Sequence, residues 1–198
     1  MRKRLFLCAS LFVLAISSPA LPQVTETTHL TTAFGQGEPV NSAPSSAQLS
    51  EIIAWISGNL ALPEISELPR VELVTPARMA AVRFRGLASD REALAVEAGR
   101  TAPPEFGQDV YAVYDDVKRT IYLHKQWTAV RPADVSVLVH ELVHHIQNVA
   151  ALKFGCPQER EKDAYEAQRA WLAQSGRTLE DEFEIDPMTV LVRTNCGF

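Results

Sequence analysis

The sequence predicts an α+β domain, with a small antiparallel or mixed sheet against which helices pack. Three observations lead to this prediction. Apolar residues recur at helical spacing within 49–60, two β-prone runs lie at 109–114 and 120–124, and two long helical stretches begin at Pro132 and Pro157. We therefore expect a leading helix, then a small sheet, then two helices that pack on it.

The first 20 residues have the layout of a secretory signal peptide. Basic residues at 2–4 precede an apolar run at 5–16 and a small-residue triplet at 18–20. The apolar run is shorter than the ~20 residues that a membrane-spanning helix needs. We expect the protein to be exported, as a periplasmic or secreted protein without a permanent membrane anchor.

Removal of residues 1–20 would change the net charge from −5 to −8, because it removes three basic residues and no acidic ones. An acidic surface repels phosphate backbones, and no run of Lys or Arg interrupts it. Nucleic acid is therefore excluded as an expected partner. The sequence does not indicate an oligomeric state.

Residues 21–46 are rich in Thr, Ser, Pro, Gln and Gly, so we interpret them as a flexible leader. Residues 47–198 then have the size of one domain with one core. Either Ser46 or Ser50 could cap the helix predicted within 49–60. A β-branched run at 70–75 follows, and Pro76 ends it and opens a further helix.

The runs at 109–114 and 120–124 predict a hairpin, because charged turn residues separate them. Side chains alternate along a strand, so Tyr122 and His124 should share one face of the second run. The helix from Pro132 should reach about residue 153, and the helix from Pro157 about residue 175.

The helix from Pro132 carries His140-Glu141-Leu142-Val143-His144, an HExxH motif. Residues four apart on a helix are offset by about 40°, so both histidines can bind one zinc ion while Glu141 stands beside it. The rest of the helix is apolar except for a narrow stripe that includes Gln147, and histidines in such a setting need a partner. His145 is rotated by about 140° from His140, and we interpret it as a surface residue or one that supports a ligand without binding the metal.

A catalytic zinc site usually has three protein ligands and one open position. Helical angles along the next helix favour Glu161 as the third ligand, because it lies on an inward stripe with residues such as Tyr165 and Gln168. Glu159 falls on the opposite, charged face. A carboxylate centred on an apolar stripe needs a compensating charge, which a zinc ion would supply.

The stretch 120–172 resembles the zincin metallopeptidases, in particular those with a glutamate ligand on a helix after HExxH. The resemblance rests on HELVHHIQ at 140–147 and EKDAYEAQ at 161–168. It also extends to small exported bacterial proteins of unassigned function. The resemblance implies a zincin-like domain, with an HExxH helix and a following ligand helix, that hydrolyses peptide bonds with zinc.

One position departs from the family pattern. Thermolysin-like enzymes have an aspartate four residues after the ligand glutamate, whereas Tyr165 stands four residues after Glu161. Glu159 and Asp163 do have that spacing, so Glu159 remains the alternative third ligand.

In the expected reaction, Glu141 takes a proton from the attacking water and gives it to the leaving amine of a peptide or protein substrate. The resemblance implies that substrate lies along an edge strand before the motif helix, here 120–124. Tyr122, His124 or Tyr165 could stabilise the oxyanion. The structural role is favoured for each, because aromatic residues in strands and amphipathic helices usually pack. The alternative function is a metal-stabilised binding module without turnover.

Two cysteines, Cys156 and Cys196, follow the predicted signal peptide. In an oxidising compartment they are candidates for a disulfide. A disulfide closing a loop of 40 residues would stabilise the fold by about 4 kcal/mol on the loop-entropy model. Two unpaired thiols are the alternative, because sequence sets neither their distance nor their geometry.

Overall fold

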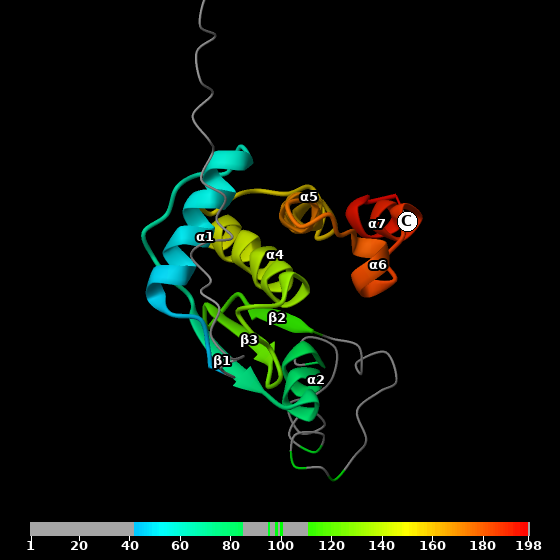
Figure 1. Ribbon diagram of the computed structural model, residues 1–198. Helices are drawn as coiled ribbons and strands as arrows, with labels where there is room; N and C mark the ends of the chain where they lie inside the picture. The colour runs from blue at the N-terminus through cyan, green and yellow to red at the C-terminus, as the bar shows by residue number, and fades with distance from the viewer. Residues whose placement is uncertain (1–41, 85–94, 96–97, 99, 101–110, 198) are drawn as a thin grey trace, which may run out of the picture. The chain divides into compact units, whose positions relative to one another are not determined.

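The computed structural model describes residues 42–84, 95, 98, 100 and 111–197, all within one compact unit, Phe34–Phe198. The predicted signal peptide and residues 21–41 of the predicted leader lie outside these residues. The elements, in chain order, are α1 (Ser46–Asn59), β1 (Arg70–Val74), α2 (Pro76–Phe84), β2 (Ala112–Asp115), β3 (Thr120–His124), α4 (Pro132–Val149), α5 (Glu159–Ala173), α6 (Leu179–Phe183) and α7 (Pro187–Thr194) (Figure 1). The α+β class is confirmed.

The sheet of the described residues has the strand order β1-β3-β2. β2 and β3 pair antiparallel, with Ala112 opposite Leu123, so the predicted hairpin is confirmed. β1 pairs with β3 in parallel, with Arg70 opposite Thr120. The expectation that 120–124 is an edge strand is therefore wrong, because β1 occupies its other side. The hydrophobic pattern could not indicate this, since it marks strands and not their neighbours.

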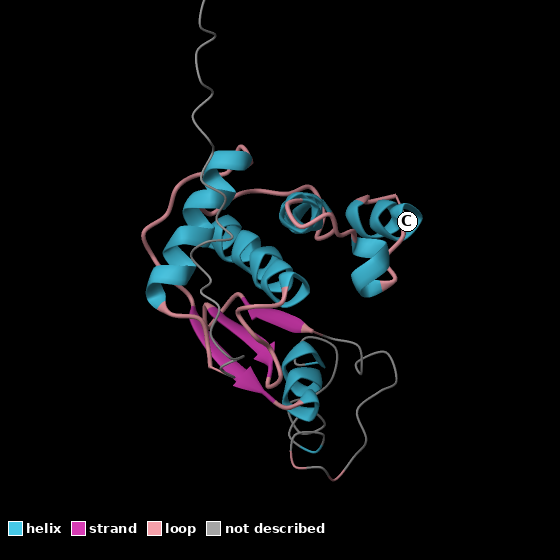
Figure 2. Cartoon of the chain, viewed as in Figure 1, coloured by secondary structure: helices cyan, strands magenta, loops and turns pink. Residues whose placement is uncertain are grey.

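Helices cover both faces of this sheet. α2 packs on one face, where Met79 and Val82 contact Tyr122 and Val113. α4 packs on the other face (Figure 2), against β2 and β3. Three residues of β3, Ile121, Tyr122 and Leu123, are at most 2% exposed, so both faces of the central strand are core.

The leading helix α1 begins with a capping box that links Ser45 to Gln48. The cap is therefore neither Ser46 nor Ser50, and the domain begins within the predicted leader. α1 buries Leu49 and the isoleucines of its inner face, and it packs against α4.

α4 begins at Pro132 as predicted but ends at Val149 rather than near residue 153. Ala151 adopts a left-handed conformation with φ 51°, and the Leu152 N–H donates to the Gln147 carbonyl, as in a Schellman ending. The chain therefore turns four residues before the glycine that was expected to stop the helix. α5 begins at Glu159, two residues after Pro157, and ends at Ala173.

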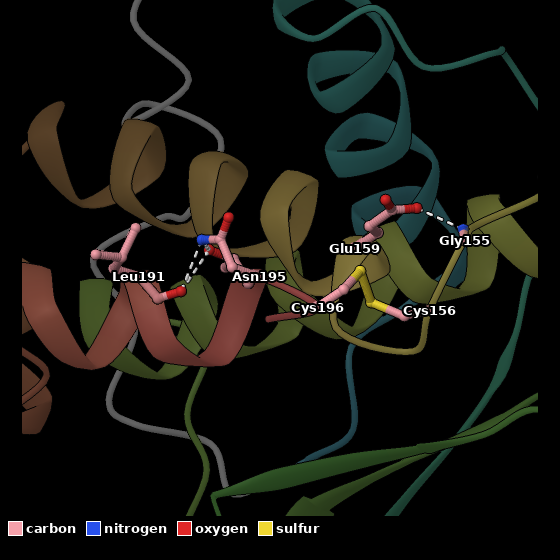
Figure 3. Close-up of a disulfide and its surroundings, with 7 residues drawn as sticks. Gly155, Cys156, Glu159, Leu191, Asn195 and Cys196 are labelled. Atoms are coloured by element: carbon pink, nitrogen blue, oxygen red, sulfur yellow. Dashed lines mark hydrogen bonds between the residues drawn. A yellow bond between two sulfur atoms is a disulfide. The ribbon is translucent and has the colours of Figure 1, made fainter. Parts of the chain in front are cut away.

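The C-terminal helices α6 and α7 pack on the outer side of α5, through a cluster centred on Tyr165, Leu172 and Leu179. Cys156 and Cys196 form a disulfide with a Cα–Cα distance of 5.9 Å, so the predicted bond is present (Figure 3). It joins the loop before α5 to the residues after α7. None of the helices in the described part of the chain is both long and apolar enough to span a bilayer.

Candidate metal centre

The candidate site lies where α4 packs against α5. His140 and His144 come from α4 and Glu161 from the first turns of α5. One ligand atom from each of the three residues lies within 4.8 Å of the other two. His140 Nε2 is 3.2 Å from Glu161 Oε2, and His144 Nε2 is 3.4 Å from Glu161 Oε1.

The two histidine–glutamate distances run to different carboxylate oxygens, and each is close to the spacing of adjacent ligand atoms around one tetrahedral ion. Zinc binds nitrogen and carboxylate oxygen at about 2.0–2.2 Å, so adjacent ligand atoms in a tetrahedron lie about 3.3–3.5 Å apart. The residues present therefore fit a divalent metal ion of this type. Among the described residues, no further His, Cys, Asp or Glu joins the group, which would leave the fourth position open.

The far nitrogen of each histidine is held by a glutamine. His140 Nδ1 lies 3.0 Å from Gln168 Oε1, and His144 Nδ1 lies 3.1 Å from Gln147 Oε1. Gln147 Nε2 donates to the Arg160 carbonyl and to Asp163, so its Oε1 must be the atom that faces His144. Because this oxygen accepts a hydrogen bond, the His144 hydrogen sits on Nδ1 and the lone pair on Nε2.

This arrangement has a consequence for charge. With both Nδ1 atoms donating to glutamines, hydrogen bonds from the two Nε2 atoms to Glu161 would require two imidazolium ions. Two neutral histidines and a carboxylate around one divalent cation need no such protonation. Side-chain exposures of only 12% for His140 and 9% for His144 make a doubly charged pair costly.

The structure brings Glu161, and not Glu159, to the histidines. Its two carboxylate oxygens face the Nε2 atoms of His140 and His144, as those of a third metal ligand would. The Glu159 carboxylate instead accepts a hydrogen bond from the Gly155 N–H (Figure 3). Although α5 begins later than expected, the relative angles along it are those of the predicted stripe.

Glu141 lies beside the group and is not part of it. It is 8% exposed, and burial, with a smaller contribution from the Glu161 charge, raises its pKa to about 7. The Tyr114 backbone N–H, close to the carboxylate, acts in the opposite direction. This is the placement expected of a proton acceptor next to a metal-activated water.

Two of the three aromatic candidates lie away from the group. Tyr122 packs against Met79 and Val82, on the face of the sheet opposite α4. His124 shares that face, and its Nδ1 accepts a hydrogen bond from the Gln126 N–H. The alternation along β3 predicted their common face, but not that α4 would cover the other one.

Tyr165 does lie at the group. Its ring is edge-on to the His140 ring, with centroids 4.9 Å apart, and it is 8% exposed. Its hydroxyl oxygen accepts a hydrogen bond of 2.7 Å from Arg193 Nη1. Tyr165 also lines a cavity of about 240 Å³ between α5 and α7.

His145 is a core residue, and its interpretation as a surface residue is wrong. It is 0% exposed, and it lies between the Tyr114 hydroxyl and the Glu67 carbonyl, each 3.0 Å from one ring nitrogen. Burial lowers the pKa of His145 and raises that of Tyr114 to about 12. His145 lies on the side of α4 opposite the metal-ligand face. That side packs on the sheet, so β2 buries His145.

Four contributors to the site were not predicted: Gln147 and Gln168 as histidine partners, Tyr114 as a donor to Glu141, and Arg193 as the partner of Tyr165. The two glutamines lay on the predicted inward stripes, and an amide on such a stripe is a usable signal. The sequence gives one indirect signal for the pairing of Arg193 with Tyr165. A disulfide between Cys196, three residues after Arg193, and Cys156 brings this segment close to the start of α5.

Comparison with known proteins identifies one family. The family described as "Domain of unknown function (DUF6647)" matches residues 41–198. No curated protein and no solved structure matches the chain.

Proposed function

Since this chain belongs to the family of domains of unknown function DUF6647, we propose its function from the site alone: it is an exported, zinc-dependent peptidase. The observation that carries the proposal is the set of His140, His144 and Glu161 around one point, with a glutamine behind each histidine. Two histidines and one glutamate with an open fourth position are a ligand set of catalytic zinc.

Each residue has a distinct role in the proposed reaction. When bound, zinc would supply Lewis-acid chemistry to a water molecule and to the scissile carbonyl. Glu141 accepts the proton of the attacking water and delivers it to the leaving amine. A carboxyl whose burial favours the protonated form is suited to hold that proton between the two steps.

The edge available to a substrate differs from the one expected. β3 is central, so an extended peptide cannot pair with it. β2 is the edge strand that contacts α4, and the outward N–H of Tyr114 already reaches Glu141. We propose that substrate lies along β2, where main-chain hydrogen bonds could hold it next to Glu141.

Export is supported by the disulfide and by the signal-like residues 1–20. Disulfides persist in oxidising compartments such as the periplasm or the extracellular medium, and are rare in the cytosol.

The decisive experiment separates metal binding from turnover. We expect the purified protein to bind one equivalent of zinc, His140→Ala and His144→Ala to lose it, and Glu141→Gln to keep it while hydrolysis of a peptide library falls at least 100-fold. His124→Ala is the matched control, because that histidine lies on the other face of the sheet. Zinc that remains stoichiometric in the double histidine variant would exclude this site.

A zinc-loaded wild type that cleaves no peptide would favour the alternative, a metal-stabilised binding module. In that case Glu141→Gln should leave its function intact.

A further inference from the structure

A hydrogen bond connects the last helix of the chain to the candidate metal centre. Arg193 is in the last turn of α7, and its Nη1 donates to the Tyr165 hydroxyl oxygen at 2.7 Å. The Tyr165 ring in turn lies edge-on to the His140 ring. Arg193 therefore reaches the site through a single side chain.

The geometry of this bond leaves the Tyr165 hydrogen available. A guanidinium has no acceptor, so the phenol oxygen must accept from Arg193 and its own hydrogen must point elsewhere. Tyr165 lies one turn after Glu161 on α5, and its ring is 4.9 Å from the His140 ring, so the phenol borders the candidate metal centre. Tyr165 can therefore donate toward the centre where a carbonyl oxygen would become negative.

Two features hold α7 in the position that this bond requires. Val190, one turn before Arg193, packs against the cluster of Tyr165, Leu172 and Leu179. The disulfide of Cys196, three residues after Arg193, fixes the chain to Cys156 before α5 (Figure 3). Arg193 thus lies between two anchored residues, Val190 in the apolar cluster and Cys196 in the disulfide.

We infer that Arg193 is a positioning residue of the candidate site: it orients the Tyr165 hydroxyl toward the oxyanion of the reaction, and the Cys156–Cys196 disulfide keeps it in place. This inference rests on the proposed function. It assigns a task to the C-terminal helix, which carries no metal ligand.

A double-mutant cycle on the zinc-loaded full chain tests the inference. We expect Tyr165→Phe to lower kcat about 100-fold, and Arg193→Gln about 10-fold, with KM and zinc affinity within about two-fold of wild type. In the Tyr165→Phe background, Arg193→Gln should have no further effect, because it acts only through the hydroxyl. Arg193→Lys should recover part of the loss.

Arg169→Gln is the matched control, since it removes an exposed arginine from α5 and should leave kcat unchanged. Cys196→Ser should lower kcat as much as Arg193→Gln, and combining the two should add nothing. A variant is preferable to a thiol reductant here, because dithiols bind zinc. Additive losses for Arg193→Gln and Tyr165→Phe, or an unchanged kcat in Arg193→Gln, would overturn the inference.

A binding arm separates this inference from the proposed function. Acetohydroxamic acid chelates zinc through two oxygens, and its titration into the zinc-loaded protein needs no turnover. Both Arg193→Gln and Tyr165→Phe should raise its Kd about 10-fold, without additivity. If the wild type cleaves no peptide but this coupling is present, the peptidase proposal fails and the positioning role stands. Absence of coupling overturns the role, and a wild type that binds no zinc overturns both.

Discussion

The hydrogen-bond acceptors behind the two histidines are neutral amides. A carboxylate in that position would raise the basicity of the ligand, whereas Gln147 and Gln168 fix the tautomer without adding negative charge. The metal would then keep more of its positive charge for substrate and water. At this scale, the choice of acceptor sets how strongly the centre polarises what it binds.

Gln168 should control zinc affinity without touching zinc. We expect Gln168→Leu to weaken zinc binding about 10- to 100-fold, because His140 loses the acceptor that orients it. Gln168→Glu should restore or exceed the wild-type affinity. Chelator competition measures both, with the exposed Gln174→Leu at the C-cap of α5 as the control. Equal affinities for Gln168→Leu and wild type would show that the amide has no such role.

The third ligand can be tested by comparing two glutamates two residues apart. Glu161→Gln should lower zinc affinity at least 10-fold, since the carboxylate faces both histidines. Glu159→Gln should behave as a surface change, because its carboxylate only accepts the Gly155 N–H. The reverse ranking, measured by the same chelator competition, would mean that α5 is rotated relative to α4.

The sequence predicts a residue's role when that role is set within one helix. It does not when the role is set by a contact between helices. The placement of Glu161 followed from angles within one helix, and it survives an error of two residues in where α5 begins. The bonds of Gln168 to His140 and of Arg193 to Tyr165 depend on which helices face each other. No angle within one helix carries that information.

At the scale of elements, a salt bridge joins the β2–β3 turn to the first turn of α5. Arg160 donates to Asp116 through its two terminal guanidinium nitrogens, Nη1 and Nη2, at 2.8 and 3.0 Å. The Asp116 carbonyl also accepts from Asn148, near the end of α4. One turn residue thus contacts both ligand-bearing helices.

This salt bridge makes stability depend on pH. The hydrogen bond from Arg160 is the main reason why the pKa of Asp116 lies below its usual range. A depressed pKa contributes stability that is present above the unfolded value of about 3.8 and is lost as the pH falls through the folded value.

We expect Asp116→Asn to lower the free energy of unfolding at pH 7 by up to about 1 kcal/mol, a modest effect because Asp116 is half exposed. The difference from wild type should shrink as the pH falls below about 4. Urea denaturation at several pH values measures it, with the exposed Glu51→Gln in α1 as the control. A difference that stays constant with pH would mean that ionisation of the Asp116 carboxylate does not contribute to stability.

Helices and strands could be predicted where the spacing of apolar residues and the positions of prolines and turn residues indicate the same boundaries. The start of α4 at Pro132 and the hairpin of β2 and β3 are of this kind. The end of α4 was not, because Ala151 takes a left-handed conformation that is usually associated with glycine. The parallel pairing of β1 with β3 was also missed, since it depends on a crossover and not on a local turn.

At the scale of the whole molecule, the disulfide closes a loop of 40 residues that contains all of α5, α6 and α7. We expect Cys156→Ala with Cys196→Ala to lower the free energy of unfolding by up to about 4 kcal/mol, chiefly by freeing the unfolded chain. Urea denaturation measures this, and thiol titration of native protein should find neither cysteine reactive. Two reactive thiols in exported material would contradict the bond.

The loop closed by the disulfide also determines what happens when a protease cuts the chain. The segment 174–178 between α5 and α6 is exposed, and such segments are where proteases of a shared compartment cut. A cut there would sever the chain after Glu161 and before Arg193, yet both pieces would remain joined through Cys156 and Cys196. A nicked molecule would still hold its last helix against Tyr165, and it would separate into two fragments on a gel only after reduction.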